Sequence, residues 1–256
     1  MRAMGLEGWL AGAHRPLPSR RLHSRVAPQE PVCAPTLQSH YSCLIPPSML
    51  FVAALFEDQP VIVDMSEEIP VKHPLSSAPH RTDIERENAT EKQTAQDAKQ
   101  TTTMTLFTPT GEHIIAGTNK GWLNIIETKT HQVRYSFRVS NNIIVYIRLT
   151  PSGRDVVLNS SDRIVRTLHL PDLSDPKLDF DTLQLEVEHK FQDLVQRLSW
   201  NHVSFSPTGE YVTASTWMNH HIYVWERGQG SLVKILEGTK EELSVVEVRS
   251  AKILSR

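Results

Sequence analysis

The sequence predicts an all-β fold, and two observations carry this prediction. A hydrophobe-(Ser/Thr)-Pro-(Ser/Thr)-Gly turn occurs three times and ends at Gly111, Gly153 and Gly209. In each copy the proline fixes φ at the first corner and the glycine supplies the positive φ that follows, so the chain reverses. Short runs rich in β-branched and aromatic residues follow each turn, as in antiparallel sheets.

The spacing of the three turns indicates which all-β fold is present. The turn glycines stand 42 residues apart in the interval 111–153 and 56 apart in the interval 153–209. A period near 42 is typical of a four-stranded blade of a WD-repeat β-propeller, and the longer interval fits one blade plus an insertion of about 14 residues. The sequence therefore predicts a WD-repeat β-propeller with an incomplete set of about four blades. The period alone leaves open an antiparallel sandwich with Pro-Gly turns.

Composition and charge set broad limits on the class of protein. The chain has 256 residues, 39% hydrophobic content and a formal net charge of -2, so we expect a soluble globular protein whose charge does not dictate a partner. The longest apolar run, 49–56, is too short to span a membrane. Cys33 and Cys43 are too few for a disulfide framework and lack zinc-ligand spacing, which favours a reducing compartment.

Residues 1–40 differ from the rest of the chain. They are rich in arginine and proline and show no sheet periodicity, so we expect a disordered segment unrelated to the blades. An arginine-rich start also fits a mitochondrial presequence. Pro16, Pro18 and Pro28 argue against one, because they would break the amphipathic helix that such a signal needs.

We expect the propeller blades over 41–248. Apolar runs at 49–56 and 60–63 predict the outer part of a first blade whose turn motif is worn down. Residues 66–100 carry mixed charges and several prolines without a hydrophobic period, which predicts an exposed loop insertion. The glycosylation sequon Asn88-Ala-Thr90 within it is interpreted as a coincidence of composition.

The strands of the next blades follow at short intervals, as in a meander. A second insertion, 171–198, begins with four aspartates that lack the spacing of a calcium loop. Val187, Phe191, Leu194 and Leu198 share a helical face, which predicts one or two helical turns docked on the sheet. The predicted strands are 113–116, 122–127, 132–139, 143–149, 155–159, 163–170, 211–215, 222–225, 231–236 and, from 243 to 248, the start of a further one.

The sequence contains no motif for catalysis, a cofactor or a metal ion. Phosphate-binding glycine loops, nucleophile elbows and zinc-protease motifs are absent. His220 and His221 are expected on adjacent strand positions, where they would point to opposite faces and could not share a metal ion. Trp122, Trp217 and Trp225 are interpreted as blade core or rim. We therefore predict a protein without enzymatic activity; a propeller enzyme would need His, Asp and Glu clustered at matching blade positions.

Several segments resemble one family more closely than a generic propeller. They resemble the retinoblastoma-binding WD-repeat subunit of COMPASS-type histone H3 lysine-4 methyltransferase complexes, in a fungal-type form, over about Tyr41 to Val248. The match includes an insertion and a loop as well as the repeat signature. The segments that carry it are 159–166, 191–197 with Trp200, 209–212, 222–226 and 230–243.

The resemblance implies a noncatalytic scaffold in the nucleus. Its expected partners are a SET-domain histone methyltransferase, other COMPASS subunits and nucleosomal DNA, with no membrane, small-molecule substrate or cofactor. Arg163, Arg197 and Lys240 match basic loop positions of the family that approach DNA, where contacts with phosphate would give sequence-independent, salt-dependent affinity. Met218 stands where the family has a further arginine.

The chain also departs from the family pattern at both ends. The family is implied to have seven blades and a C-terminal tail, whereas here the first blades are replaced by the segment before Tyr41. Residues 249–256 stand where the last blade and the tail would continue. A chain truncated in this way would leave open sheet edges. An adaptor in ubiquitin ligation or in trafficking is the alternative that the repeat period permits equally.

Overall fold

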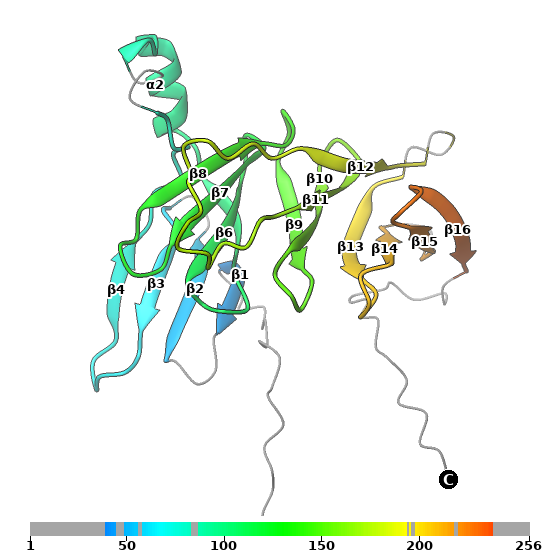
Figure 1. Cartoon of the computed structure of the whole chain (residues 1–256), viewed down its shortest axis with the longest axis horizontal. Coiled ribbons are helices and arrows are strands. Elements are labelled where there is room, and N and C mark those ends of the chain that lie inside the picture. Colours follow the sequence, from blue (N-terminus) through cyan, green and yellow to red (C-terminus); the bar gives the residue numbers. More distant parts are fainter. Residues whose placement is uncertain are drawn as a thin grey trace, which may run out of the picture. The chain divides into compact units, whose positions relative to one another are not determined.

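The computed structural model describes residues 49–55, 58–82, 87–193, 195, 198–217 and 220–237, and the backbone alone of 39–44 (Figure 1). These residues all lie within one compact unit of the chain, Pro31–Arg256. They form four antiparallel sheets of four strands each, together with the helix α2 (Glu91–Ala98). The all-β prediction and the expected number of about four blades are confirmed for the described residues.

The sheets follow one another along the chain. The first contains β1 (Ser39–Leu44), β2 (Leu50–Leu55), β3 (Val61–Asp64) and β4 (Val71–Pro74). The second contains β5 (Thr102–Phe107), β6 (His113–Thr118), β7 (Trp122–Glu127) and β8 (Val133–Arg138). The third contains β9 (Ile144–Leu149), β10 (Asp155–Ser160), β11 (Val165–His169) and β12 (Val187–Phe191). The fourth contains β13 (Trp200–Phe205), β14 (Tyr211–Thr216), β15 (Ile222–Glu226) and β16 (Ser231–Leu236).

Each sheet is a simple meander in which strands adjacent in sequence pair antiparallel. The first strand of a sheet packs against the first two strands of the sheet before it: β5 on β1 and β2, β9 on β5 and β6, and β13 on β9 and β10. Neighbouring blades of a propeller pack in this way, with their first strands innermost. The arrangement argues against the two facing sheets of a sandwich.

The three Pro-Gly turns have the same hydrogen bonds, as the repeat predicted. Gly111, Gly153 and Gly209 have φ of 75°, 72° and 75°, and the N–H of each donates to the carbonyl three residues earlier. That earlier residue, Thr108, Thr150 or Ser206, also accepts a hydrogen bond on its hydroxyl from the N–H five residues ahead, at 3.2, 3.2 and 3.0 Å. Each turn therefore sets the register of the hairpin that it closes.

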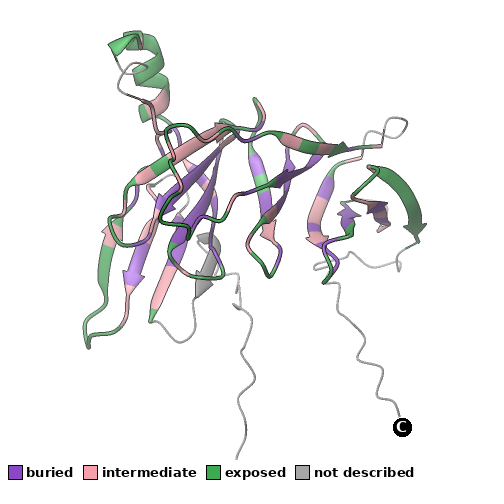
Figure 2. Cartoon of the chain, in the orientation of Figure 1, coloured by how far each residue is buried: buried purple, intermediate pink, exposed green. Residues whose placement is uncertain are grey.

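The core lies between the sheets. Strand β6 is buried at all six positions, whereas the outermost strand β16 is exposed at all six (Figure 2). Four apolar side chains of β16 are 40% to 56% exposed, namely Leu232, Val233, Ile235 and Leu236. The buried centre is rich in β-branched residues, which suit strands that are covered on both faces.

Two segments predicted as insertions contain outer strands. Residues 71–74 within the 66–100 segment form β4, so the first sheet has all four strands and is more than the outer part of a blade. The helical turns predicted around Val187 and Phe191 are wrong, because 187–191 form β12 and pair with β11. A run of five residues is too short to distinguish the periodicity of a helix from that of a strand. Pairing with the edge of β11 makes this run a strand.

The helix α2 lies in the connection between the first and second sheets and has no buried residue. A capping box at Thr90 and Gln93 stabilises its N-terminus, and the ion pair of Arg81 with Asp97, at 2.6 Å, ties its last turn to the connection. No helix in the described part of the chain has the length and apolar character needed to cross a membrane. The expectations for 1–38 and for a strand at 243–248 lie outside the described residues.

Candidate nucleic-acid interface

Of the basic positions predicted to face DNA, Arg163 is the one among the described residues, and it lies at one end of its sheet. In each meander, the turn between the second and third strands lies at the same end as the connection to the next sheet, because the third and fourth strands run antiparallel. We call this the connection end. Arg163 lies there, in the turn between β10 and β11, and is exposed. Arg197, Lys240 and Met218 lie outside the described residues.

Arg163 has an unusual backbone conformation for an arginine. Its φ is 67°, and its N–H donates to the carbonyl oxygen of Ser160 at 3.0 Å. In the equivalent turn of the second sheet the corresponding position is Gly121, with φ of 79° and a 3.2 Å bond to Thr118. An L-residue in the left-handed region costs about 1–2 kcal/mol relative to its preferred conformation. The backbone conformation of this turn position therefore suits glycine, but the residue that occupies it is an arginine.

A buried arginine, Arg166, stabilises this turn through hydrogen bonds. Arg166, which is 5% exposed, donates to both carboxylate oxygens of Asp162 at 3.0 and 2.5 Å and to the hydroxyl of Ser160 at 2.9 Å. It also donates to the carbonyl of Ile164 at 3.2 Å. Bidentate bonds between a guanidinium and a carboxylate fix geometry as well as charge. Arg166 thus constrains the residues on both sides of Arg163.

The fourth sheet supplies a further contact to the turn. The indole Nε1 of Trp200, at the start of β13, donates to the carbonyl oxygen of Arg163 at 2.9 Å. Trp200 is 5% exposed, and its ring lies edge-on to those of Tyr223 and Trp225, with centroids 5.0 and 5.3 Å away. The neighbouring Ser199 accepts a 3.0 Å bond from the N–H of Trp217. The connection between the third and fourth sheets is therefore anchored to turns of both.

The opposite end of the same two sheets carries a separate charge network. Arg227 donates to Asp155 at 2.7 Å and to Glu188 at 2.8 Å, and His169 lies 2.8 Å from Asp155. Burial acts to raise the pKa of Asp155, but hydrogen bonds from Arg227 and His169 outweigh it and the pKa is lowered. Burial acts to lower the pKa of Arg227, but its bonds to the two carboxylates raise it. These groups pair with each other, so this end contains a structural network.

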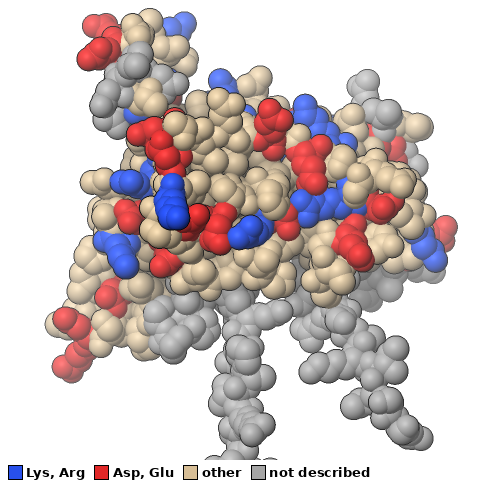
Figure 3. Space-filling model, in the orientation of Figure 1, with Lys and Arg blue, Asp and Glu red and all other residues tan. Residues whose placement is uncertain are grey.

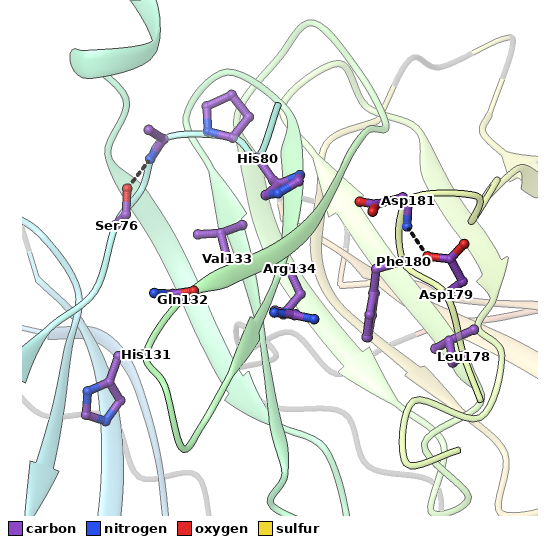
Figure 4. Close-up of a pocket in the computed structure, with 12 residues that line it drawn as sticks. Ser76, His80, His131, Gln132, Val133, Arg134, Leu178, Asp179, Phe180 and Asp181 are labelled. Carbon is purple, nitrogen blue, oxygen red and sulfur yellow. Dashed lines mark hydrogen bonds between the residues drawn. The ribbon is translucent and has the colours of Figure 1, made fainter. Parts of the chain in front are cut away.

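A cleft of about 700 Å³ opens along the outer strand of the second sheet (Figure 4). Its walls are the 76–80 connection, residues 131–134 and the 178–181 loop. The guanidinium of Arg134 lies 5.8 Å from the ring centroid of Phe180, and the carboxylates of Asp179 and Asp181 lie on the same wall as that ring. Groups of both signs line the cleft, so its charge favours no single class of ligand.

Charges of both signs are also interspersed on the face shown in Figure 3. The acidic loop predicted at 171–181 is part of this pattern: Asp172 pairs with Arg154 at 2.8 Å, and the carboxylates of Asp172, Asp175 and Asp179 accept bonds from backbone N–H groups two residues ahead. No group of three or more potential metal ligands occurs among the described residues. These aspartates therefore stabilise the backbone of their own loop.

The histidine pair does not occupy adjacent strand positions, and that prediction is wrong. His220 has φ of 53° and lies in the turn, and β15 begins only at Ile222. Of the tryptophans, Trp225 is 3% exposed in the core and Trp217 is 55% exposed at the connection end. Trp200 and Arg166, which hold the Arg163 turn, were named from the sequence only within segments that carry the family resemblance, and no structural role was predicted for either. The four-residue spacing of Asp162 and Arg166 was the one local signal for part of this arrangement.

Comparison with known proteins identifies the class and then the family. No protein-family model matches the chain. The crystal structure of the Cps50 (Swd1) β-propeller domain of Myceliophteria thermophila matches with a TM-score of 0.68 and 52% identity, over 76% of this chain and 58% of that one. The chain is therefore a WD-repeat β-propeller protein.

Curated relatives narrow the assignment. The chain is 45% identical over 198 residues to the Set1 complex component swd1 of Schizosaccharomyces pombe, covering 77% of this chain and 46% of that protein. It is 31% identical over 201 residues to the COMPASS component SWD1 of Saccharomyces cerevisiae, covering 76% and 44%. It belongs to the family of Swd1 and retinoblastoma-binding protein 5, as the sequence resemblance predicted. The chain spans about half the length of these curated relatives.

Proposed function

We propose that this chain is a noncatalytic WD-repeat scaffold subunit of a nuclear COMPASS/SET1-type complex that methylates lysine-4 of histone H3. The observation that carries the proposal is the 45% identity over 198 residues to a protein named as a Set1 complex component. The expected partners are a SET-domain methyltransferase and other subunits of that complex. A blade surface can serve this role without an active site, because sheet faces and rim loops supply docking area.

The chemistry of the described residues supports a noncatalytic role. Asp155, an acid with a lowered pKa, and Arg227, a base with a raised pKa, face each other in an ion pair between two sheets. Perturbed groups of this kind stabilise structure when their charges are mutually satisfied, whereas a catalytic group needs access to a substrate.

Affinity purification tests the scaffold proposal. The tagged full-length chain, expressed in the organism that encodes it, should recover a SET-domain methyltransferase from nuclear extract. A matched control is the same chain with Phe191→Ala and Trp225→Ala, which removes the ring contact at 5.3 Å between the third and fourth sheets and should lose these partners. Recovery of cytoplasmic partners alone would reject the assignment to chromatin.

The second part of the proposal is that Arg163, Arg197 and Lys240 contact the phosphates of nucleosomal DNA. It is supported by their match to basic loop positions in the family and by the exposure of Arg163 at the connection end. Removal of one bond to phosphate should lower the slope of log affinity against log salt by about 0.9. Sequence preference should not change, because phosphates carry no base information.

Charge-matched variants test this interface. The triple change Arg163→Ala, Arg197→Ala and Lys240→Ala should weaken binding to a DNA duplex and reduce the salt dependence. The control removes three charges from the opposite end of the sheets, with Arg154→Ala, Lys177→Ala and Lys129→Ala. Equal decreases in affinity for the two variants would show a nonspecific effect of net charge and remove the proposed interface.

A further inference from the structure

We propose that Trp200 and Arg166 are positioning residues that hold Arg163 in the conformation in which it meets a phosphate of duplex DNA. This inference rests on the proposed DNA contact of Arg163 and adds how the fold prepares that residue. It assigns roles to two buried side chains that do not themselves reach DNA.

The first step is the strained backbone of Arg163. A positive φ of 67° is uncommon at an arginine, and among the described residues His131 and His220 are the other non-glycine residues with a positive φ. The equivalent turn position in the second sheet is a glycine. Such conformations persist only where the surrounding structure enforces them, and they gather at sites with a function. Here the strained residue is also exposed, so its unusual backbone directs a side chain that solvent and a ligand can reach.

The second step is the clamp beneath the turn. Arg166 bonds to Asp162 and to Ser160, which precede Arg163, and to the carbonyl of Ile164 after it. Because Arg166 is 5% exposed, this clamp is shielded from competing water and salt. The turn is therefore held at both ends by a single rigid fork of donors.

The third step is the bond from the next sheet. Trp200 donates its indole N–H to the backbone carbonyl of Arg163 at 2.9 Å. Its ring is packed edge-on against Trp225 and Tyr223, so the indole direction is set by the fourth sheet. The orientation of the peptide that follows Arg163 thus depends on the packing of two sheets.

Preorganisation of this kind favours phosphate binding. An arginine presents a planar fork that can bond two phosphate oxygens at once, which demands a defined approach. Ordering a flexible loop on binding costs affinity, and a turn already fixed by Trp200 and Arg166 avoids that cost.

The experiment uses the full-length chain and a short DNA duplex, with affinity measured over a salt series. The variants are Arg163→Gln, Trp200→Phe, Arg166→Lys and the double variants that combine Arg163→Gln with each of the other two. Trp200→Phe keeps an aromatic ring and removes the donor, and Arg166→Lys keeps the charge and removes the fork. Phe107→Leu is the control, because it changes a buried aromatic residue at the end of β5, which is opposite to the connection end and takes no part in the contacts of the Arg163 turn.

We expect Trp200→Phe and Arg166→Lys to lower affinity about three- to tenfold at low salt, by the loss of about one charge-assisted hydrogen bond. Each should also reduce the salt slope by up to about 0.9, as Arg163→Gln does. Neither should weaken binding further when Arg163→Gln is already present. Phe107→Leu should leave affinity and slope unchanged.

The outcomes separate this inference from the proposed function. If Arg163→Gln leaves DNA affinity unchanged, or the wild-type chain does not bind, the DNA contact and the positioning role both fall. If Arg163→Gln weakens binding but Trp200→Phe and Arg166→Lys do not, or their effects add to it, the DNA contact stands and the positioning role is rejected.

A stability comparison tests the strain directly and does not depend on DNA. Arg163→Asn and Arg163→Val remove the same charge, but asparagine tolerates a positive φ and valine does not. Arg163→Val should therefore have a thermal midpoint lower than that of Arg163→Asn by at least about 2–4 °C. Equal midpoints would show that the turn is not held at positive φ and would overturn the inference even if Trp200→Phe fails to fold.

Discussion

The guanidinium of Arg227 lies 2.7 Å from the carboxylate of Asp155, across the contact between the fourth and third sheets. Both side chains are largely buried, at 14% and 16% exposure, and Glu188 and His169 complete the network. Removing one partner of an ion pair that is shielded from water is more destabilising than removing one from an exposed pair, because the other charge stays buried without its counterion. The pair therefore joins two sheets that are consecutive along the chain.

Asp155→Asn should reduce the free energy of unfolding at neutral pH by about 1–3 kcal/mol, because Arg227 loses a charged partner. The folded-state pKa of Asp155 is below its ordinary value. The contribution of Asp155 to the free energy of unfolding is therefore complete above its unfolded-state pKa. It is lost below about pH 4, as the pH falls through the lower folded-state pKa. Urea unfolding over pH 2–7 should show the wild type and the variant converging at the acid end.

The matched control is Asp172→Asn. Its partner Arg154 lies 2.8 Å away, but the two side chains are 53% and 50% exposed. Exposed pairs contribute about 0–1 kcal/mol, so this change should leave stability nearly unaltered at every pH. A decrease equal to that of Asp155→Asn would mean that burial is not what gives the Arg227 pair its strength.

Phe191→Ala should be strongly destabilising, by about 3–5 kcal/mol. Phe191 ends β12, is 1% exposed and packs on Trp225 of the next sheet with ring centroids 5.3 Å apart. Truncation would leave a cavity between the third and fourth sheets. Chemical denaturation measures the effect, and a decrease under about 1 kcal/mol would place Phe191 outside the core and contradict the strand assignment of 187–191.

Gly117→Ala should destabilise the chain by about 1–3 kcal/mol through overpacking. A Cβ at this position of β6 would lie 2.7 Å from Cγ2 of Ile144 and 2.9 Å from Cδ1 of Ile147, both on β9 of the next sheet. Gly228→Ala is the control, since its Cβ would meet nothing closer than 3.7 Å. Thermal unfolding of the two variants should differ clearly, and similar midpoints would contradict the close approach of the second and third sheets.

Tyr223 should ionise late in an alkaline titration. Burial and the hydrogen bond to Asp193, at 2.8 Å, raise its pKa to about 12. Since the protonated phenol is favoured in the folded state, the associated stability is present below the unfolded-state value near pH 10 and is lost as the pH rises through the folded value. In an ultraviolet titration, the wild type should show a tyrosine ionisation near pH 12 that is absent from Tyr223→Phe. Disappearance of a component near pH 10 instead would contradict the bond to Asp193.

Much of the fold could be predicted from local patterns, for a physical reason. The Pro-Gly turns need particular backbone angles, and Gly111, Gly153 and Gly209 are the residues that supply them at low cost. The hairpins that they close were therefore predicted with nearly the observed strands. The period of the turns also predicted the four-stranded repeat, because one blade is one structural unit.

The outer strands and the Arg163 turn could not be predicted in the same way. Strands β4 and β12 have short, partly exposed sequences, and only pairing with β3 and β11 makes them strands. Such pairing is tertiary information, which a window of five residues does not contain. The bond from Trp200 to Arg163 joins residues 37 apart from different sheets, so no local pattern could indicate it.

Strand β16 has a consequence for how the chain behaves in concentrated solution. No described strand pairs with its outer edge, and Lys234 is the single charge among its six residues. A lone lysine on an edge strand opposes stacking of like chains by repulsion and by its cost of desolvation. Neutral acylation of the Lys234 amine would remove this protection and make the edge of β16 more prone to pair with a strand of another copy.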